Sequence, residues 1–212
     1  MGTDIHGIFQ RKTDTGWEDV QSNYNQERHY ALFAWLGNVR NGFGFAGTPT
    51  HDRIEPLSDC RGFPEDFIVE DGEDHQISCN AMRGGRAKYY EQEDADPSDD
   101  SHLKMWMGDH SHSWLLDDEI LNAKPPRILR TGIVTVEFFR GWDGESSPDS
   151  WCGGVSGPGV VVSSPSDVTE KTSHVQVEWF EDTSKSYAYF IDEVRRLKKE
   201  YGQVRFVFGF DS

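Results

Sequence analysis

The last thirty residues constrain the fold most, because a helical pattern there is followed directly by a strand pattern. Between Ser184 and Tyr201, apolar side chains recur at the spacing of one helix face, acids come early, bases come late, and Gly202 follows. From Val204 to Phe210, apolar and aromatic residues alternate with others. The sequence therefore predicts a long helix followed by a terminal strand.

Two further elements are predicted near the start of the chain. Asp4–Phe9 alternates with a period of two, as in a strand. Arg28–Val39 places apolar and aromatic residues at helical spacing, and Gly37 with Asn38 would end the helix. We therefore predict a first strand and a short helix.

The middle of the chain predicts a helix and two strands. SWLLDDEILNA is typical of a short helix capped by Ser113 or Asp117. Ile133–Arg140 and Val175–Phe180 are rich in β-branched and aromatic residues, which favours two antiparallel strands. Together the elements predict a single α+β domain over residues 1–212, with a mixed, mainly antiparallel sheet and two or three helices.

An acidic stretch at about residues 65–100 changes the character of the chain. It holds twelve acids, six of them in EQEDADPSDD, and only Arg83, Arg86 and Lys88 as bases. Such a composition favours a mobile surface excursion. We therefore predict a long acidic insertion here.

The charge of the whole chain limits its partners. Against 37 Asp and Glu there are only 21 Lys and Arg, a formal net charge of −16. A surface this negative repels phosphate backbones and anionic lipid, which argues against general nucleic-acid binding and membrane binding. The sequence leaves a homo-oligomer open.

The expected cellular compartment and the expected state of the cysteines follow from the apolar runs and the cysteine spacing. No apolar run approaches a membrane span, and the start, MGTDIHGIFQRK, lacks the apolar stretch of a secretion signal, so we expect a cytoplasmic protein. Cys60, Cys79 and Cys152 are odd in number and widely spaced, which favours free thiols.

The first candidate site is the pair Asp4 and His6. Residues i and i+2 of a strand project from the same face, so a carboxylate and an imidazole would converge there, as an acid–base pair or metal ligands must. The alternative is an orienting hydrogen bond at a strand edge. A lone DxH pattern favours that plainer interpretation.

The second candidate is the cluster Asp109, His110 and His112 in GDHSHSW. At the start of a helix, the positive end of the dipole would favour neutral imidazoles, which bind metals or act as bases. Combined with Asp4 and His6, the cluster would supply enough donors for a divalent-metal site. The alternative is that Ser111 and Ser113 cap the helix, that His112 is solvated, and that one of the two histidines has a structural role.

The third candidate is a set of arginines, Arg28, Arg40 and Arg61, beside aromatic or glycine-rich residues. Arginines can hold a phosphate or carboxylate bidentately while Tyr30 or Trp114 stacks on a ring. The alternative for each one is an ion pair with the surplus acids.

Several segments together resemble a family of small phage and prophage proteins that begin MG-x-DIH and contain HS-x-SWL. They are MGTDIH, RHYALFAWLGNVRN, IEPLSDCRGFPEDF, DHSHSWLLDDEIL and YFIDEVRRLKKEYGQVRFVFGFDS, about half of the chain. The family carries no settled activity. The resemblance implies a phage context, in which nucleotide-type ligands such as cyclic nucleotides or ADP-ribose-like defence signals are natural.

Polar residues in the matching segments suit a concave site for an anionic small molecule. The expected catalytic residues are Asp4, His6 and His110, which are also the expected ligands of a divalent metal. The expected ligand-binding residues are Tyr30, Arg40, Asn41, Arg61, Ser113 and Trp114.

The leading hypothesis is a phage accessory protein that binds and hydrolyses a nucleotide-like signal, as a phosphodiesterase-type enzyme of the infected host's cytoplasm. The histidines, with Asp4 and a metal, would activate water. Two alternatives stay open. One is a sponge that sequesters the signal without chemistry, and the other is an inhibitor whose acids at 65–100 imitate DNA.

Overall fold

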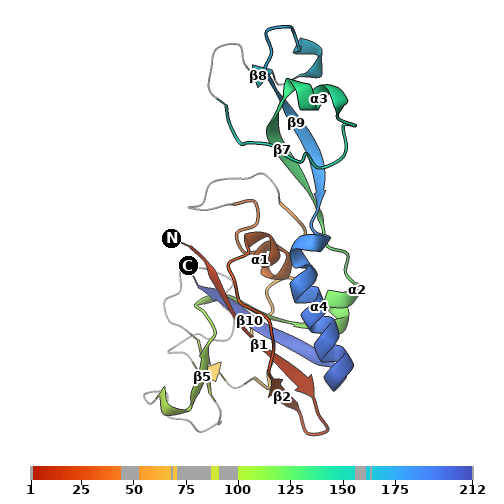
Figure 1. The fold of residues 1–212 in the computed structure, drawn as a ribbon. Coiled ribbons are helices and arrows are strands. Elements are labelled where there is room, and N and C mark those ends of the chain that lie inside the picture. The colour runs from red at the N-terminus through yellow and green to blue at the C-terminus, as the bar shows by residue number, and fades with distance from the viewer. Residues whose placement is uncertain are drawn as a thin grey trace. The chain divides into compact units, whose positions relative to one another are not determined.

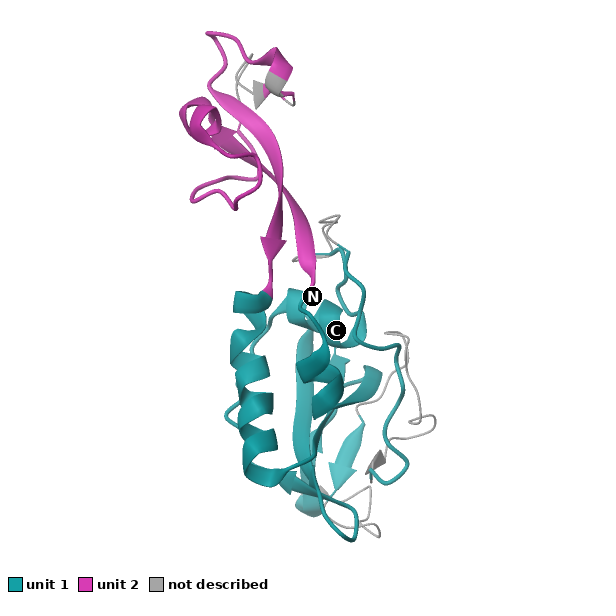
Figure 2. Ribbon diagram, turned by 90° about the vertical axis from the view of Figure 1, so that its right-hand side faces the viewer, with its two compact units in different colours: residues 1–125, 184–212 teal, residues 126–183 magenta. Residues whose placement is uncertain are grey.

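The computed structural model describes residues 2–43, 53–67, 69–70, 87–90, 100–155, 161–162 and 164–211. These residues form an α+β fold with mainly antiparallel sheets, as predicted (Figure 1). The chain groups into two compact units, residues 1–125 with 184–212, and residues 126–183 (Figure 2). That the whole chain is one domain stays a prediction.

A four-stranded antiparallel sheet organises the first unit. It contains β1 (Asp4–Lys12), β2 (Trp17–Val20), β6 (His110–Leu116) and β10 (Val204–Asp211) in the order β2-β1-β10-β6. Strands β1 and β10 come from opposite ends of the sequence and pair over eight residues. The predicted first and last strands are both confirmed.

Two helices cover one face of this sheet, α1 (Tyr30–Gly37) and α4 (Ser184–Tyr201) (Figure 1). The ring of Phe33 lies 5.2 Å from that of Phe210, and the ring of Phe190 lies 5.4 Å from that of Phe206. These fully buried aromatic side chains form the core of the unit. Both predicted helices are confirmed.

The helix predicted from Ser113 begins later. Residues up to Leu116 belong to strand β6, and α2 spans Asp117–Asn122. Pairing with β10 buries Ser113 and Leu115, so tertiary contacts override the local helical pattern. The N-cap is therefore Leu116, and the prediction of Ser113 or Asp117 for that role is wrong.

A small sheet packs on the other face of the four-stranded sheet. Its strands are β3 (Val69–Glu70), β4 (Lys88–Tyr90) and β5 (Leu103–Trp106), and a 3-10 turn, η2 (Asp100–His102), precedes β5. Tyr89 and Val207 meet in one apolar cluster between the two sheets. The predicted acidic excursion is thus wrong for 87–90, which are largely buried. Most of its other residues lie outside the described ones.

The second unit is built on an antiparallel pair, β7 (Arg127–Thr135) and β9 (His174–Asp182). A two-residue strand, β8 (Val161–Val162), pairs in parallel with β9, and the unit also contains α3 (Val136–Gly141) and η3 (Pro165–Asp167). The predicted pairing is confirmed, but the first strand ends at Thr135. Its hydroxyl accepts a bond from Phe138 N at 3.3 Å and begins α3 where we predicted strand.

Two other sequence predictions can be compared with the structure. None of the helices formed by the described residues combines the length and apolarity that a membrane crossing needs. Cys152 is free and exposed, but Cys60 is disulfide-bonded, so the expectation of free thiols is wrong for Cys60.

Candidate functional site

Several of the residues singled out from the sequence gather at one end of the four-stranded sheet, where β1 and β6 begin and β10 ends. We call this group the His6–Asp211 cluster. Its members are Asp4, His6, Arg28 and Asp211, and Arg40 and His110 lie next to it.

A histidine–aspartate pair lies at the centre of the cluster. Asp4 is opposite Asp211 in the β1–β10 register, and His6 lies two residues along β1 on the same face. His6 Nε2 is 3.2 Å from Asp211 Oδ2, and the imidazole is 24% exposed. The carboxylate therefore orients the ring and leaves Nδ1 for contact with a molecule from solution.

Arg28 and Asp4 form a second pair beside it. Arg28 Nε and Nη2 donate to the two carboxylate oxygens of Asp4 at 2.9 and 2.7 Å. The hydrogen bond with Arg28 lowers the pKa of the Asp4 carboxyl, which stays ionised. Both side chains are almost half exposed, so an external anion can reach the guanidinium.

Arg40 and Tyr30 adjoin the cluster from the two ends of α1. Arg40 has a positive φ of 57° and donates from Nε to Thr3 Oγ1 at 2.7 Å. Its guanidinium carbon lies 5.5 Å from the centre of the Tyr30 ring. Among the described residues, the buried Tyr30 hydroxyl has no hydrogen-bond partner. A buried polar group of this kind calls for an explanation, such as a water molecule or an ion beside it.

His110 reaches the cluster from the opposite face of the sheet. It pairs with Phe210, which pairs with Ile5, and its ring stacks on Phe210 at 6.2 Å. Asp4 and His6 alternate with Ile5 and project to the other face. Burial lowers the pKa of His110, although the charges of Asp109 and Asp211 oppose that shift.

The predicted catalytic and metal set is therefore only partly brought together. His110 is 3% exposed and belongs to the apolar face, so its ring does not share a surface with Asp4 and His6. Among the described residues, no three His, Cys, Asp or Glu side chains are arranged to hold a metal ion, so Asp4, His6 and His110 do not form such a group. The expected metal site is thus not formed by these residues.

The two histidines of GDHSHSW are not at a helix start, contrary to the dipole argument. Both lie in β6. The ring of His112 is stacked 4.4 Å from that of Phe63, and burial lowers its pKa to about 4. His112 is thus a neutral structural residue, so one of the two histidines is structural as the alternative held, but His112 is buried and not solvated.

Arg61, Ser113 and Trp114 form a separate group. Arg61 donates to both carboxylate oxygens of Glu119, at 3.0 and 2.5 Å, and its guanidinium lies 5.1 Å from the Trp114 ring centre. Arg61 N also donates to Ser113 Oγ at 3.4 Å. The expected ligand roles of these residues give way to an internal ion pair stacked on tryptophan.

Asn41 has a structural role as well. Its amide donates to Ile54 O at 2.7 Å and accepts from Ile54 N at 2.9 Å, which ties the loop after α1 to the chain at residue 54. Both ends of the amide are used, so the side chain contributes to the loop and not to ligand binding.

Sequence reasoning missed Asp211 and a buried polar network. Asp211 carries no motif and becomes recognisable only through its pairing with Asp4. In the network, Arg205 donates to Gln10 and Asp66, while Tyr89 and Lys104 bond Asp19. One signal of this network was present in the sequence, because Arg205 lies among the apolar residues of β10.

Comparison with models of protein families, with curated proteins and with solved structures found no match to this chain.

Proposed function

We propose that the His6–Asp211 cluster binds a small anionic, nucleotide-like molecule and hydrolyses a phosphoester bond in it, with His6 as general base. The observation that carries the proposal is a partly exposed imidazole that bonds a carboxylate, beside an arginine whose own side chain is almost half exposed. Carboxylate-oriented histidines act as proton acceptors, and arginines bind phosphate. The resemblance to phage proteins implies that this reaction takes place in the cytoplasm of an infected bacterium.

The anion would be held by guanidinium groups. A phosphate competes with the Asp4 carboxylate for the two donors of Arg28, because both groups match the planar fork. Arg40, whose guanidinium lies over the Tyr30 ring, adds a second positive charge nearby. These charges supply affinity for phosphate.

The proton would be moved by His6. Nδ1 takes a proton from a water molecule, the water oxygen bonds to phosphorus, and the bond from phosphorus to the leaving oxygen breaks. The leaving oxygen takes a proton from solvent. Asp211 holds the imidazolium during the step, since its Oδ2 faces Nε2 at 3.2 Å.

The test uses a cyclic dinucleotide and ADP-ribose as probes. We expect either or both to raise the melting temperature of the full chain and to be hydrolysed. His6→Gln keeps a donor for Asp211 and loses the base, so hydrolysis should fall about 100-fold while binding persists. His102→Gln, at an exposed histidine outside the cluster, should change nothing. Absence of both stabilisation and turnover with every probe would refute the proposal.

A sponge that binds without chemistry is the second candidate. The burial of His110 favours it, because a second accessible imidazole to protonate the leaving group is lacking there. With protein at one tenth of the probe concentration, an enzyme clears all of the probe with time, whereas a sponge stops at its number of sites. The DNA-mimic alternative concerns residues 65–100 and stays a prediction.

A further inference from the structure

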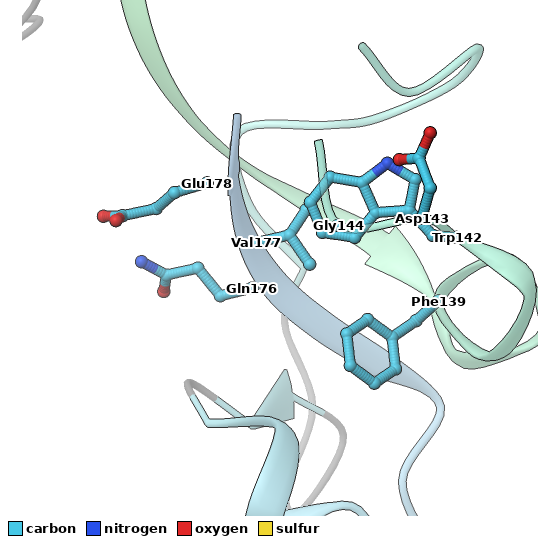
Figure 3. A pocket seen from close by; sticks show the side chains of 7 residues that line it. All are labelled: Phe139, Trp142, Asp143, Gly144, Gln176, Val177 and Glu178. Atoms are coloured by element: carbon cyan, nitrogen blue, oxygen red, sulfur yellow. The ribbon is translucent and has the colours of Figure 1, made fainter. Parts of the chain in front are cut away.

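The second unit contains a pocket that the sequence did not suggest. Its volume is about 510 Å³, within the range of small-ligand sites. It lies between β9 and the segment around the end of α3 (Figure 3). The lining residues are Phe139, Trp142, Asp143, Gly144, Gln176, Val177 and Glu178.

The pocket lies beside one edge of β9. Beyond Val175, no strand formed by the described residues pairs with this edge. Strand β8 pairs with β9 only at His174 and Val175. Ile133 uses both backbone groups to bond Cys152, so its partner Gln176 directs its own groups away from β7. By alternation, the N–H and C=O of Glu178 point to the same open edge. The parallel bridge between Val162 and Val175 uses the N–H of Gln176, so among the described residues the C=O of Gln176 and both backbone groups of Glu178 face this edge next to the pocket.

The side chains give the pocket an apolar floor and an acidic rim. Phe139, Trp142 and Val177 lie on one side of β9, and Gln176 and Glu178 project from the other side (Figure 3). Trp142 is fixed by its Nε1–H, which donates to Ser146 O at 2.8 Å. The lining residues that the structure describes include no lysine, arginine or histidine. Rings with a carboxylate nearby suit the aliphatic stem and cationic head of a basic side chain.

Asp143 is the fixed negative charge of the rim. Its Oδ1 accepts from the backbone N–H of Ser146 and of Glu145, each at 2.8 Å, and from the Ser146 hydroxyl at 2.9 Å. These bonds lower the pKa of the carboxyl, so it is ionised at neutral pH. Oδ2 stays available to a partner, because all three bonds go to Oδ1.

We propose that the open edge of β9 binds an extended basic peptide as an added strand, with one lysine or arginine side chain seated between Phe139 and Trp142. The backbone groups at this edge supply hydrogen bonds, and Asp143 selects positive charge on the face of the added strand that meets the rings. This site is separate from the His6–Asp211 cluster and does not depend on its function.

The first test varies the peptide and keeps the full chain unchanged. A fluorescein-labelled peptide of alternating lysine and valine should bind, as measured by fluorescence anisotropy. The same peptide with N-methyl groups on alternate amides keeps its charge and loses the backbone donors, so its affinity should fall about tenfold or more. Alternating glutamate and valine should not bind. Equal binding of the methylated peptide, or of the acidic one, would overturn strand addition.

The second test varies the pocket. Asp143→Asn keeps the acceptor for the turn and removes the charge, so the lysine peptide should bind about threefold more weakly. Asp149→Asn removes one exposed charge outside the pocket and is the matched control, with unchanged affinity expected. Trp142→Leu should weaken binding about fivefold. If Asp143→Asn and Asp149→Asn have the same effect, the peptide recognises only the net charge and the proposed pocket is wrong.

Discussion

The first unit uses one histidine and one arginine in each of two places, and burial separates their roles. Between the two sheets, His112 is 1% exposed and the Arg205 side chain is 4% exposed. At the end of the four-stranded sheet, the side chains of His6 and Arg28 are 24% and 45% exposed. All four are bonded to other groups of the protein. The difference teaches that bonding partners alone do not distinguish a structural group from a reactive one, whereas access to solvent does.

The largest expected effect concerns His112. Burial lowers its pKa to about 4 from an ordinary 6.5, so the unfolded chain binds a proton in this range and the folded chain does not. Stability should therefore fall as the pH drops from 6.5 to about 4, by on the order of 3 kcal/mol. His112→Gln should remove this part of the slope in urea unfolding measured across that range. An unchanged slope would mean that His112 is not neutral and buried.

Arg205 is the next test of the buried region. Arg205 donates to Gln10 at 2.8 Å and to Asp66 at 2.7 Å, and its guanidinium lies 4.3 Å from the Trp17 ring centre. Arg205→Met keeps the stem and leaves the buried Gln10 Oε1 without its donor, so the unfolding free energy should fall by about 2 kcal/mol. Urea denaturation measures the loss, and probe binding by the refolded variant should be unchanged. A loss of binding with intact stability would place Arg205 in the site.

Arg28 should behave in the opposite way. Its pair with Asp4 is almost half exposed and screened by solvent, so Arg28→Ala should leave the unfolding free energy essentially unchanged. Binding of ADP-ribose or the cyclic dinucleotide should weaken about tenfold, because one bidentate phosphate contact is lost. Isothermal titration gives the affinity. A stability loss as large as that of Arg205→Met would erase the contrast between the two regions.

The parts of the fold predicted correctly are those whose pattern is local. The helix Ser184–Tyr201 has its apolar face, charge order and terminal glycine within one segment, and β10 alternates clearly. Ser113–Leu116 and Val136–Arg140 were assigned wrongly, because strand pairing with β10 decides the first and a threonine cap decides the second. Local patterns do not contain such contacts.

The candidate site was predictable only in part, for a related reason. Asp4 and His6 were found because two strand residues in alternation share a face, and that holds in β1. Asp211 was missed because its position depends on pairing between the two ends of the chain. His110 was assigned to the same surface because its strand was interpreted as the approach to a helix. The pocket beside β9 depends on which strand edge is open, which no motif records.

The most direct measurement is histidine ¹⁵N NMR of the full chain during titration with ADP-ribose and with the cyclic dinucleotide. The account predicts that the imidazole nitrogens of His6 shift on binding, while those of His112 stay fixed. Shifts confined to other histidines, or no shift of His6 at saturating probe, would contradict the claim that the end of the sheet around His6 and Asp211 is the site.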